Sequence, residues 1–268
     1  MPAFREMPEK LATHYWLYRF SAINNSQTMS YQVPSANPAS AENRLLASLP
    51  LLDRQHVLSG CEQVELSFGH VLCEPGEAIR HVYFPTDSFI SMVIPVNSHG
   101  SLEVALVGNE GMFGIPLMLG VAESQLHVAV QGFGPAWRMN ASRFRKELKH
   151  SDVLQQHLKR YAQVLMSQLA QSAACTRFHL VEERLARWLL MTRDRAHSDE
   201  FHITHEFLAH MLGVRRVGVT KAAGALQNKK LISYSRGNVR IMDIAGLEAA
   251  SCSCYRADKE TYEHILYS

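Results

Sequence analysis

The sequence lacks any apolar run long enough to cross a membrane. Its longest such stretches, for example residues 90–96, fall far short of the roughly 20 residues that a spanning helix requires. The N-terminus also lacks the basic region, apolar region and small-residue cleavage site of a secretory signal. We therefore expect a cytoplasmic protein without a membrane partner.

Cysteine is scarce, with five residues in 268. An odd number without an export signal argues against a disulfide framework. Cys252-Ser253-Cys254 forms a Cys-x-Cys motif, which could bind a metal or sense oxidants. No second pair stands at ligand spacing in the sequence, so we predict no metal site and favour a structural or incidental role.

Net charge is also low, at +2, but it is unevenly distributed. Residues 201–241 carry seven Lys or Arg against one acid, Glu206, which gives this segment +6 and leaves −4 for the remainder. A basic C-terminal segment on a mildly acidic body is typical of proteins that bind polyanions.

Residues 1–42 have the composition of a disordered tail, because Ser, Asn, Pro and Ala replace periodic apolar residues near its end. Met29 is an alternative start of translation to Met1. Ordered structure is expected from Asn43. Residues 64–139 consist of short β-branched or aromatic segments separated by turn signals, which predicts an antiparallel sandwich or barrel.

A long amphipathic helix is predicted from about Ser151 to Thr176, because apolar residues recur there every three or four positions. Two interpretations stay open: the helix packs on its own domain, or it pairs with its twin in a homodimer. We favour the homodimer. Its seam would comprise Leu154, Leu158, Tyr161 and Leu165.

Residues 204–226 predict a helix-turn-helix. Thr204 is a suitable N-cap, and Gly213 supplies the positive φ of a tight turn between helices. An ordinary helical hairpin with a basic solvent face is the alternative. Residues 231–243 then form two β-like segments around Arg236-Gly237-Asn238, as in a wing placed to touch phosphates.

The second helix of this motif would lie in the major groove of DNA. Arg215 and Arg216, at its N-terminal end, would read guanine or contact phosphate, and Thr220 and Lys221 could do either. Val217 could touch a thymine methyl group. The full set of expected DNA contacts is Thr204, His205, Arg215, Arg216, Val217, Thr220, Lys221, Arg236 and Asn238.

Residues 43–243 resemble Crp/Fnr-type transcription regulators, on the strength of EPGEAIRHVYFP, GNEGMFGIPLMLG, the long helix and the winged motif. The resemblance implies an α+β multidomain protein. It would have a cyclic-nucleotide-binding-like jelly roll (a double-stranded β-helix) at 43–148, a dimerisation helix at 149–178, a winged helix-turn-helix at 179–250 and an extension at 251–268. Double-stranded DNA, a second copy of the chain and RNA polymerase are the implied partners.

The resemblance also implies an effector pocket, at Gly111, Phe113, Gly114, Ile115 and Gln125. Relatives that bind cyclic AMP use a Glu for the ribose and an Arg for the phosphate. Ile115 stands at the first position, and residues 121–130 contain no Arg or Lys, so we doubt cyclic AMP. Residues 1–60 lack the cysteines of an iron–sulfur sensor, and haem stays open. The cofactor is therefore unknown.

His205-Glu206 and His210 superficially resemble a zinc hydrolase motif, but two ligands on one helix face must be four residues apart and these are five apart. No catalytic constellation stands out, so we do not expect an enzyme. The leading hypothesis is a sequence-specific, homodimeric DNA-binding regulator. The alternative is a small-ligand sensor that acts through protein contacts and carries a vestigial DNA-binding head.

Overall fold

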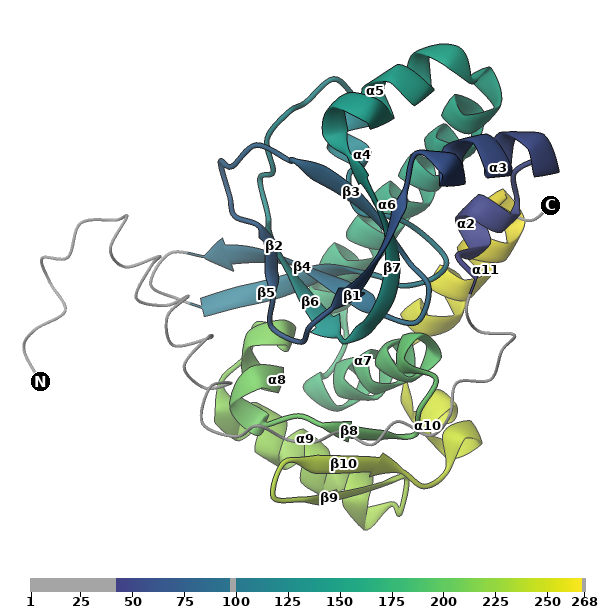
Figure 1. The fold of residues 1–268 in the computed structure, drawn as a ribbon. Coiled ribbons are helices and arrows are strands. Elements are labelled where there is room, and N and C mark those ends of the chain that lie inside the picture. Colours follow the sequence, from purple (N-terminus) through teal and green to yellow (C-terminus); the bar gives the residue numbers. More distant parts are fainter. Residues whose placement is uncertain (1–41, 97–99, 267–268) are drawn as a thin grey trace, which may run out of the picture.

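The computed structural model describes residues 42–96 and 100–266, and Figure 1 shows their arrangement. A β-roll and a long helix, α6, lie above a C-terminal domain of helices and a small sheet. Apart from its last residue, the predicted tail, with Met29, lies outside the described residues. No helix in the described ranges is long and apolar enough to cross a membrane.

Two short helices, α2 (Arg44–Ala47) and α3 (Leu51–Ser59), precede the roll. Asn43 caps α2 by accepting a hydrogen bond from the backbone N–H of Leu46. Its amide also donates to the carbonyls of Pro85 and Gly111, at 2.8 Å each. This buried side chain therefore ties the start of α2 to the end of β3 and to the loop after β5.

The predicted strand segments all form strands, and they pair antiparallel as expected. They are β1 (Glu62–Leu66), β2 (Val71–Cys73), β3 (His81–Pro85), β4 (Phe89–Val96), β5 (Gly100–Val107), β6 (His127–Gly132) and β7 (Gly134–Asn140). Two sheets result, with orders β1-β7-β3 and β2-β6-β4-β5. The short helix α4 (Ile115–Met118) connects β5 to β6. This is the jelly roll of the predicted fold class.

Helix α5 (Ala141–His150) leads into α6 (Asp152–Phe178), which has 27 residues. The residues of the predicted dimer seam are Leu154, Leu158, Tyr161 and Leu165, and each is at most 8% exposed. They belong to the hydrophobic core of the roll. This corrects the predicted seam, because side chains already packed inside one chain offer no surface to a partner.

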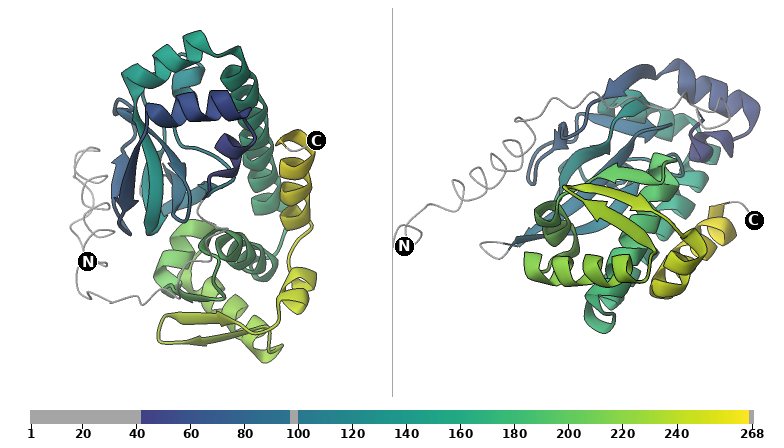
Figure 2. Two further views of the ribbon diagram at one scale, coloured as in Figure 1. Left: turned by 45° about the vertical axis from the view of Figure 1, so that its right-hand side comes forward. Right: turned by 90° about the horizontal axis from the view of Figure 1, so that it is seen from below.

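The C-terminal domain surrounds a second core. Its elements are α7 (Val181–Ala196), β8 (Glu200–His202), α8 (His205–Leu212), α9 (Arg216–Asn228), β9 (Ile232–Ser235), β10 (Asn238–Ile241) and α10 (Ile244–Ala250). Strand β8, which the sequence pattern did not predict, pairs with β10 to complete a sheet of order β8-β10-β9. Helix α11 (Cys254–Leu266) then returns to pack along α6 (Figure 2).

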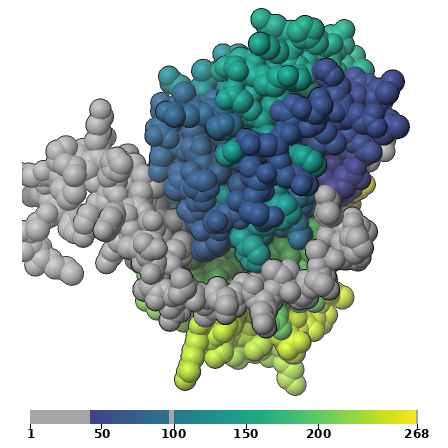
Figure 3. Space-filling view, in the orientation of Figure 1, coloured from purple at the N-terminus to yellow at the C-terminus, as the bar shows by residue number. Residues whose placement is uncertain are grey.

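The two domains contact one another through β5, which packs against α8. Figure 3 shows the blue and teal β-roll above the green and yellow C-terminal domain. The indole N–H of Trp188 on α7 donates to Glu103 at 2.7 Å, and the Ser101 hydroxyl donates to the carbonyl of His210 at 3.3 Å. A buried ion pair joins Arg195 of α7 to Glu110 in the loop after β5, at 2.6 Å. The C-terminal domain is thus attached to the roll by polar contacts as well as apolar packing.

Candidate nucleic-acid interface

Helices α8 and α9 pack across one another through small and branched side chains. Thr204 caps α8 by accepting from the backbone N–H of Phe207, and Gly213 ends the helix with φ +62°, as predicted. The inner faces of the two helices are buried, at Leu208, Ala209, Met211, Leu212, Val219, Ala222 and Leu226. The motif therefore has the geometry of a helix-turn-helix.

The outer face of α9 carries the side chains that the sequence selected for DNA contact. Arg215 is the N-cap, Arg216 opens the helix, and both are exposed. Val217 is 60% exposed, and Thr220 and Lys221 lie exposed on the next turn. The structure thus brings these five residues together on one accessible surface.

His205 and Thr220 are joined to each other, which sequence analysis did not anticipate. The imidazole Nδ1 of His205 lies 3.0 Å from the Thr220 hydroxyl, which also donates to the carbonyl of Arg216. The His205 ring stacks on Tyr234, with centroids 4.4 Å apart. Burial, and secondarily the charge of Arg216, lower the pKa of His205. His205 thus links Thr220 of α9 to Tyr234 of the wing.

The predicted wing is the hairpin of β9 and β10. Arg236 and Gly237 form its turn with φ of +49° and +85°. The side-chain oxygen of Asn238 accepts from His202 Nδ1 at 2.8 Å, across the β8–β10 pair. Arg236 and Asn238 are both exposed, and the hydrogen bond to His202 holds the Asn238 side chain against β8. Tyr234 adds a link from the wing, because its hydroxyl donates to the carbonyl of Ile203 at 2.7 Å.

Residues 183–250 match the family model of the Crp-like helix-turn-helix domain. The C-terminal module is a Crp-like helix-turn-helix domain. The match covers α7 to α10, so the domain includes the helix that carries Arg187 and Arg195. No protein of curated function matches the chain.

Similarity to solved structures extends beyond this domain to the β-roll. One is a structure from Eubacterium rectale described as a Crp/Fnr family regulator, 16% identical, with TM-score 0.63 over 77% of this chain and 96% of that one. FixK2 from Bradyrhizobium japonicum and the c-di-GMP-responsive regulator CLP from Xanthomonas campestris are each 12% identical, with TM-score 0.61 over 72% of this chain. Their own chains are covered to 98% and 100%. The chain therefore has the Crp/Fnr fold.

The expected effector-pocket residues lie mostly in the core of the β-roll. A Cβ atom on Gly111 would stand 2.1 Å from the Tyr161 hydroxyl, and one on Gly114 would stand 2.4 Å from Val82. Ile115 and Phe113 are buried, whereas Gln125 is exposed. The chain's own side chains pack closely against both glycines. The effector pocket at these positions stays a prediction.

Proposed function

We propose that the protein is a sequence-specific regulator of transcription that binds duplex DNA as a homodimer. The observation that carries this proposal is the exposed face of α9, with Arg215, Arg216, Val217, Thr220 and Lys221 above a buried apolar face. A recognition helix needs this division, since its outer side chains must reach base edges while its inner face is fixed by α8.

The charge distribution supports a polyanionic partner. Arg215 and Arg216 lie at the N-terminus of α9, where the positive end of the helix dipole also attracts anions. Arg236 at the wing tip adds a further exposed cation on the same domain. Arginine matches guanine and phosphate in a bidentate manner, which suits both base reading and backbone contact. RNA polymerase is the expected protein partner of the bound regulator.

Dimerisation is proposed through the solvent face of α6 rather than through the face predicted from sequence. Met166 is 57% exposed and Leu169 is 39% exposed. Together with the exposed Ala170 and Ala173 they form a stripe with spacings of three and four residues. Small residues on such a stripe let two helices approach closely. A two-fold dimer would bind half-sites about one helical turn apart.

Cyclic AMP is not proposed as the effector. Ile115 cannot accept a hydrogen bond from a ribose hydroxyl, and its side chain is buried at the start of α4. Each charged hydrogen bond that is lost costs about 1.5–3 kcal/mol, so losing both the ribose and phosphate partners weakens binding by roughly a hundredfold or more. Calorimetric titration with cyclic AMP should give no heat of binding at micromolar ligand.

Selection of genomic fragments by the purified full chain tests the proposed function. Enrichment of fragments that share a two-fold motif is the expected result. In titrations on the selected site, Arg216→Ala and Lys221→Ala should each cost about 1–3 kcal/mol if they read bases, with relaxed specificity at one position. An equal loss of affinity for all DNA sequences would instead identify the residue as a phosphate contact. Lys149→Ala, an exposed change on α5, is the matched control and should leave affinity unchanged.

Affinity should also fall log-linearly with salt, because phosphate contacts release counterions. Absence of binding to any duplex at low salt would contradict the proposal. It would favour the sensor that acts through protein contacts alone.

A further inference from the structure

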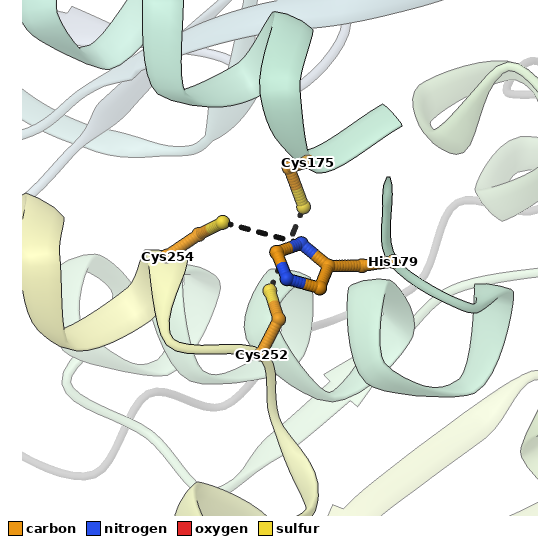
Figure 4. A group of neighbouring side chains, drawn as sticks. All are labelled: Cys175, His179, Cys252 and Cys254. Carbon is orange, nitrogen blue, oxygen red and sulfur yellow. Dashed lines mark hydrogen bonds between the residues drawn. The ribbon is translucent and has the colours of Figure 1, made fainter. Parts of the chain in front are cut away.

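Three cysteines and a histidine from distant parts of the chain converge at one point (Figure 4). Cys175 lies in the last turn of α6, and His179 is the residue that caps the end of that helix. Cys252 and Cys254 come from the loop after α10 and the first residue of α11. Sequence analysis found no partner for the Cys-x-Cys motif, and the structure supplies one from more than 70 residues away.

The spacing of the four ligand atoms suits a single ion. The sulfurs of Cys175 and Cys252 are 3.5 Å apart, and Cys254 Sγ lies 3.4 Å from His179 Nδ1. In a tetrahedral zinc site, bonds of about 2.3 Å to sulfur and about 2.0 Å to nitrogen give a sulfur–sulfur edge of about 3.8 Å and a sulfur–nitrogen edge of about 3.5 Å. All four atoms fall within 4.8 Å of one another, which leaves room for one ion and not for a multi-iron cluster.

The surroundings are those of a charged centre rather than of a small apolar cluster. Gln171 donates from Nε2 to Cys254 Sγ at 2.9 Å, as a group that orients a metal-bound thiolate does. Arg184 and Arg187 line the same small cavity as Cys175. Three thiolates around a divalent ion leave a net charge of −1, and these guanidinium groups are placed to balance it. Cysteines that serve only as packing groups need no such neighbours.

We propose that Cys175, His179, Cys252 and Cys254 bind one zinc ion in a closed, structural Cys3His site. Three sulfurs and one imidazole nitrogen fill a tetrahedral shell, so no position is left for water or substrate. Soft thiolate ligands select zinc over magnesium, calcium or manganese. The three thiols lose their protons to the solvent when the ion binds, and nothing is oxidised.

The ion would join three segments at the boundary between the two domains. Only His179 and Leu180 separate α6 from α7, so the site lies at the hinge between the long helix and the DNA-binding domain. The loop between α10 and α11 is bound to the same point. Asp258 of α11 forms a buried ion pair with Arg187 of α7 at 2.5 Å, which continues this attachment. The bound ion therefore fixes how the Crp-like domain and α11 sit against α6.

Metal analysis of the full chain, purified under reducing conditions without added chelator, tests the site. We expect about one zinc ion per chain, as a closed four-ligand site requires. Replacement of zinc by cobalt should give the visible absorption of tetrahedral thiolate coordination. Chelation should accelerate amide exchange in α11 and at the end of α6 while leaving the β-roll strands unchanged.

Cys252→Ser and His179→Gln should each lower the bound zinc at least tenfold and abolish the cobalt spectrum. Cys61→Ser is the matched control, because Cys61 is a thiol of the β-roll outside this cluster, and it should retain full zinc content. If a ligand variant fails to fold, the zinc content and cobalt spectrum of the wild type still decide the question.

A wild-type chain that holds no zinc and yields no cobalt spectrum when reduced overturns the assignment. So does copper or iron in place of zinc, or a Cys175–Cys252 disulfide in protein kept reduced. None of these outcomes depends on DNA binding, so the zinc site and the proposed function can fail separately.

Discussion

Glu103 provides a pH-dependent test of the contact between the two domains. Its carboxylate lies between β5 and α7, where it accepts hydrogen bonds from Trp188 at 2.7 Å and from the Ser91 hydroxyl at 2.5 Å. Burial raises its pKa from 4.5 to about 7, and the two hydrogen bonds only partly offset this effect. The folded chain therefore holds a proton that the unfolded chain releases between these values.

The sign and size of the effect follow from this difference. Because the folded-state pKa is the higher one, stability is fully present below pH 4.5 and falls as the pH rises to about 7. Each pKa unit corresponds to about 1.4 kcal/mol, so the upper limit is roughly 3 kcal/mol. The side chain retains some exposure, so solvent screening reduces the expected loss to about 1–3 kcal/mol.

Glu103→Gln should remove this loss, because the neutral amide can replace the protonated carboxyl at both hydrogen bonds. Denaturant unfolding should find the variant close to the wild type near about pH 5 and about 1–3 kcal/mol more stable near about pH 8. Both proteins contain the same histidines, so the difference between their free energies of unfolding reports on Glu103 alone. Glu123→Gln, an exposed control, should differ from the wild type by a constant amount below about 0.5 kcal/mol. Parallel profiles for Glu103→Gln and the wild type would refute the reasoning.

Two further substitutions, each paired with a control, test the buried ion pair between the domains and the proposed dimer interface. Glu110→Gln should lower the free energy of unfolding by about 3–5 kcal/mol, because it leaves the buried Arg195 guanidinium unpaired. Glu200→Gln breaks an exposed pair with Arg240 and should cost at most about 1 kcal/mol in the same denaturant series; equal losses would show that Arg195 is solvated. Met166→Glu should convert the proposed dimer to a monomer in sedimentation without loss of helix content, since its charge falls on the exposed stripe of α6. Gln156→Glu, exposed on the same helix about 15 Å away, should leave the dimer intact, and a wild type that already sediments as a monomer would contradict the proposed interface.

The helix-turn-helix is the part of this protein that local sequence determined. The Thr204 cap, the Gly213 turn and the alternation of buried and exposed positions on α9 depend on residues that are neighbours in the chain, so their periodicity suffices to predict them. The strands of the β-roll were predictable for the same reason. The period-two segments and the turns between them define each strand without reference to its partner.

Tertiary structure decided what each surface packs against. The periodicity of Leu154, Leu158 and Leu165 marks a buried face of α6, but it does not say whether that face is covered by the same chain or by a second copy. Likewise, only the fold shows that Tyr161 packs against Gly111. Contacts between residues far apart in sequence depend on the packing of whole elements, and local patterns do not encode it.

The cysteine cluster shows this division most clearly. Sequence spacing reveals the pair at Cys252 and Cys254, since ligands two residues apart can reach one ion. It gives no sign of Cys175 and His179, because their distance from that pair is set by the return of α11 along α6. The sequence thus contains all four proposed ligands but reveals only two of them as a group. The packing of α11 against α6 and α7 brings the four side chains together.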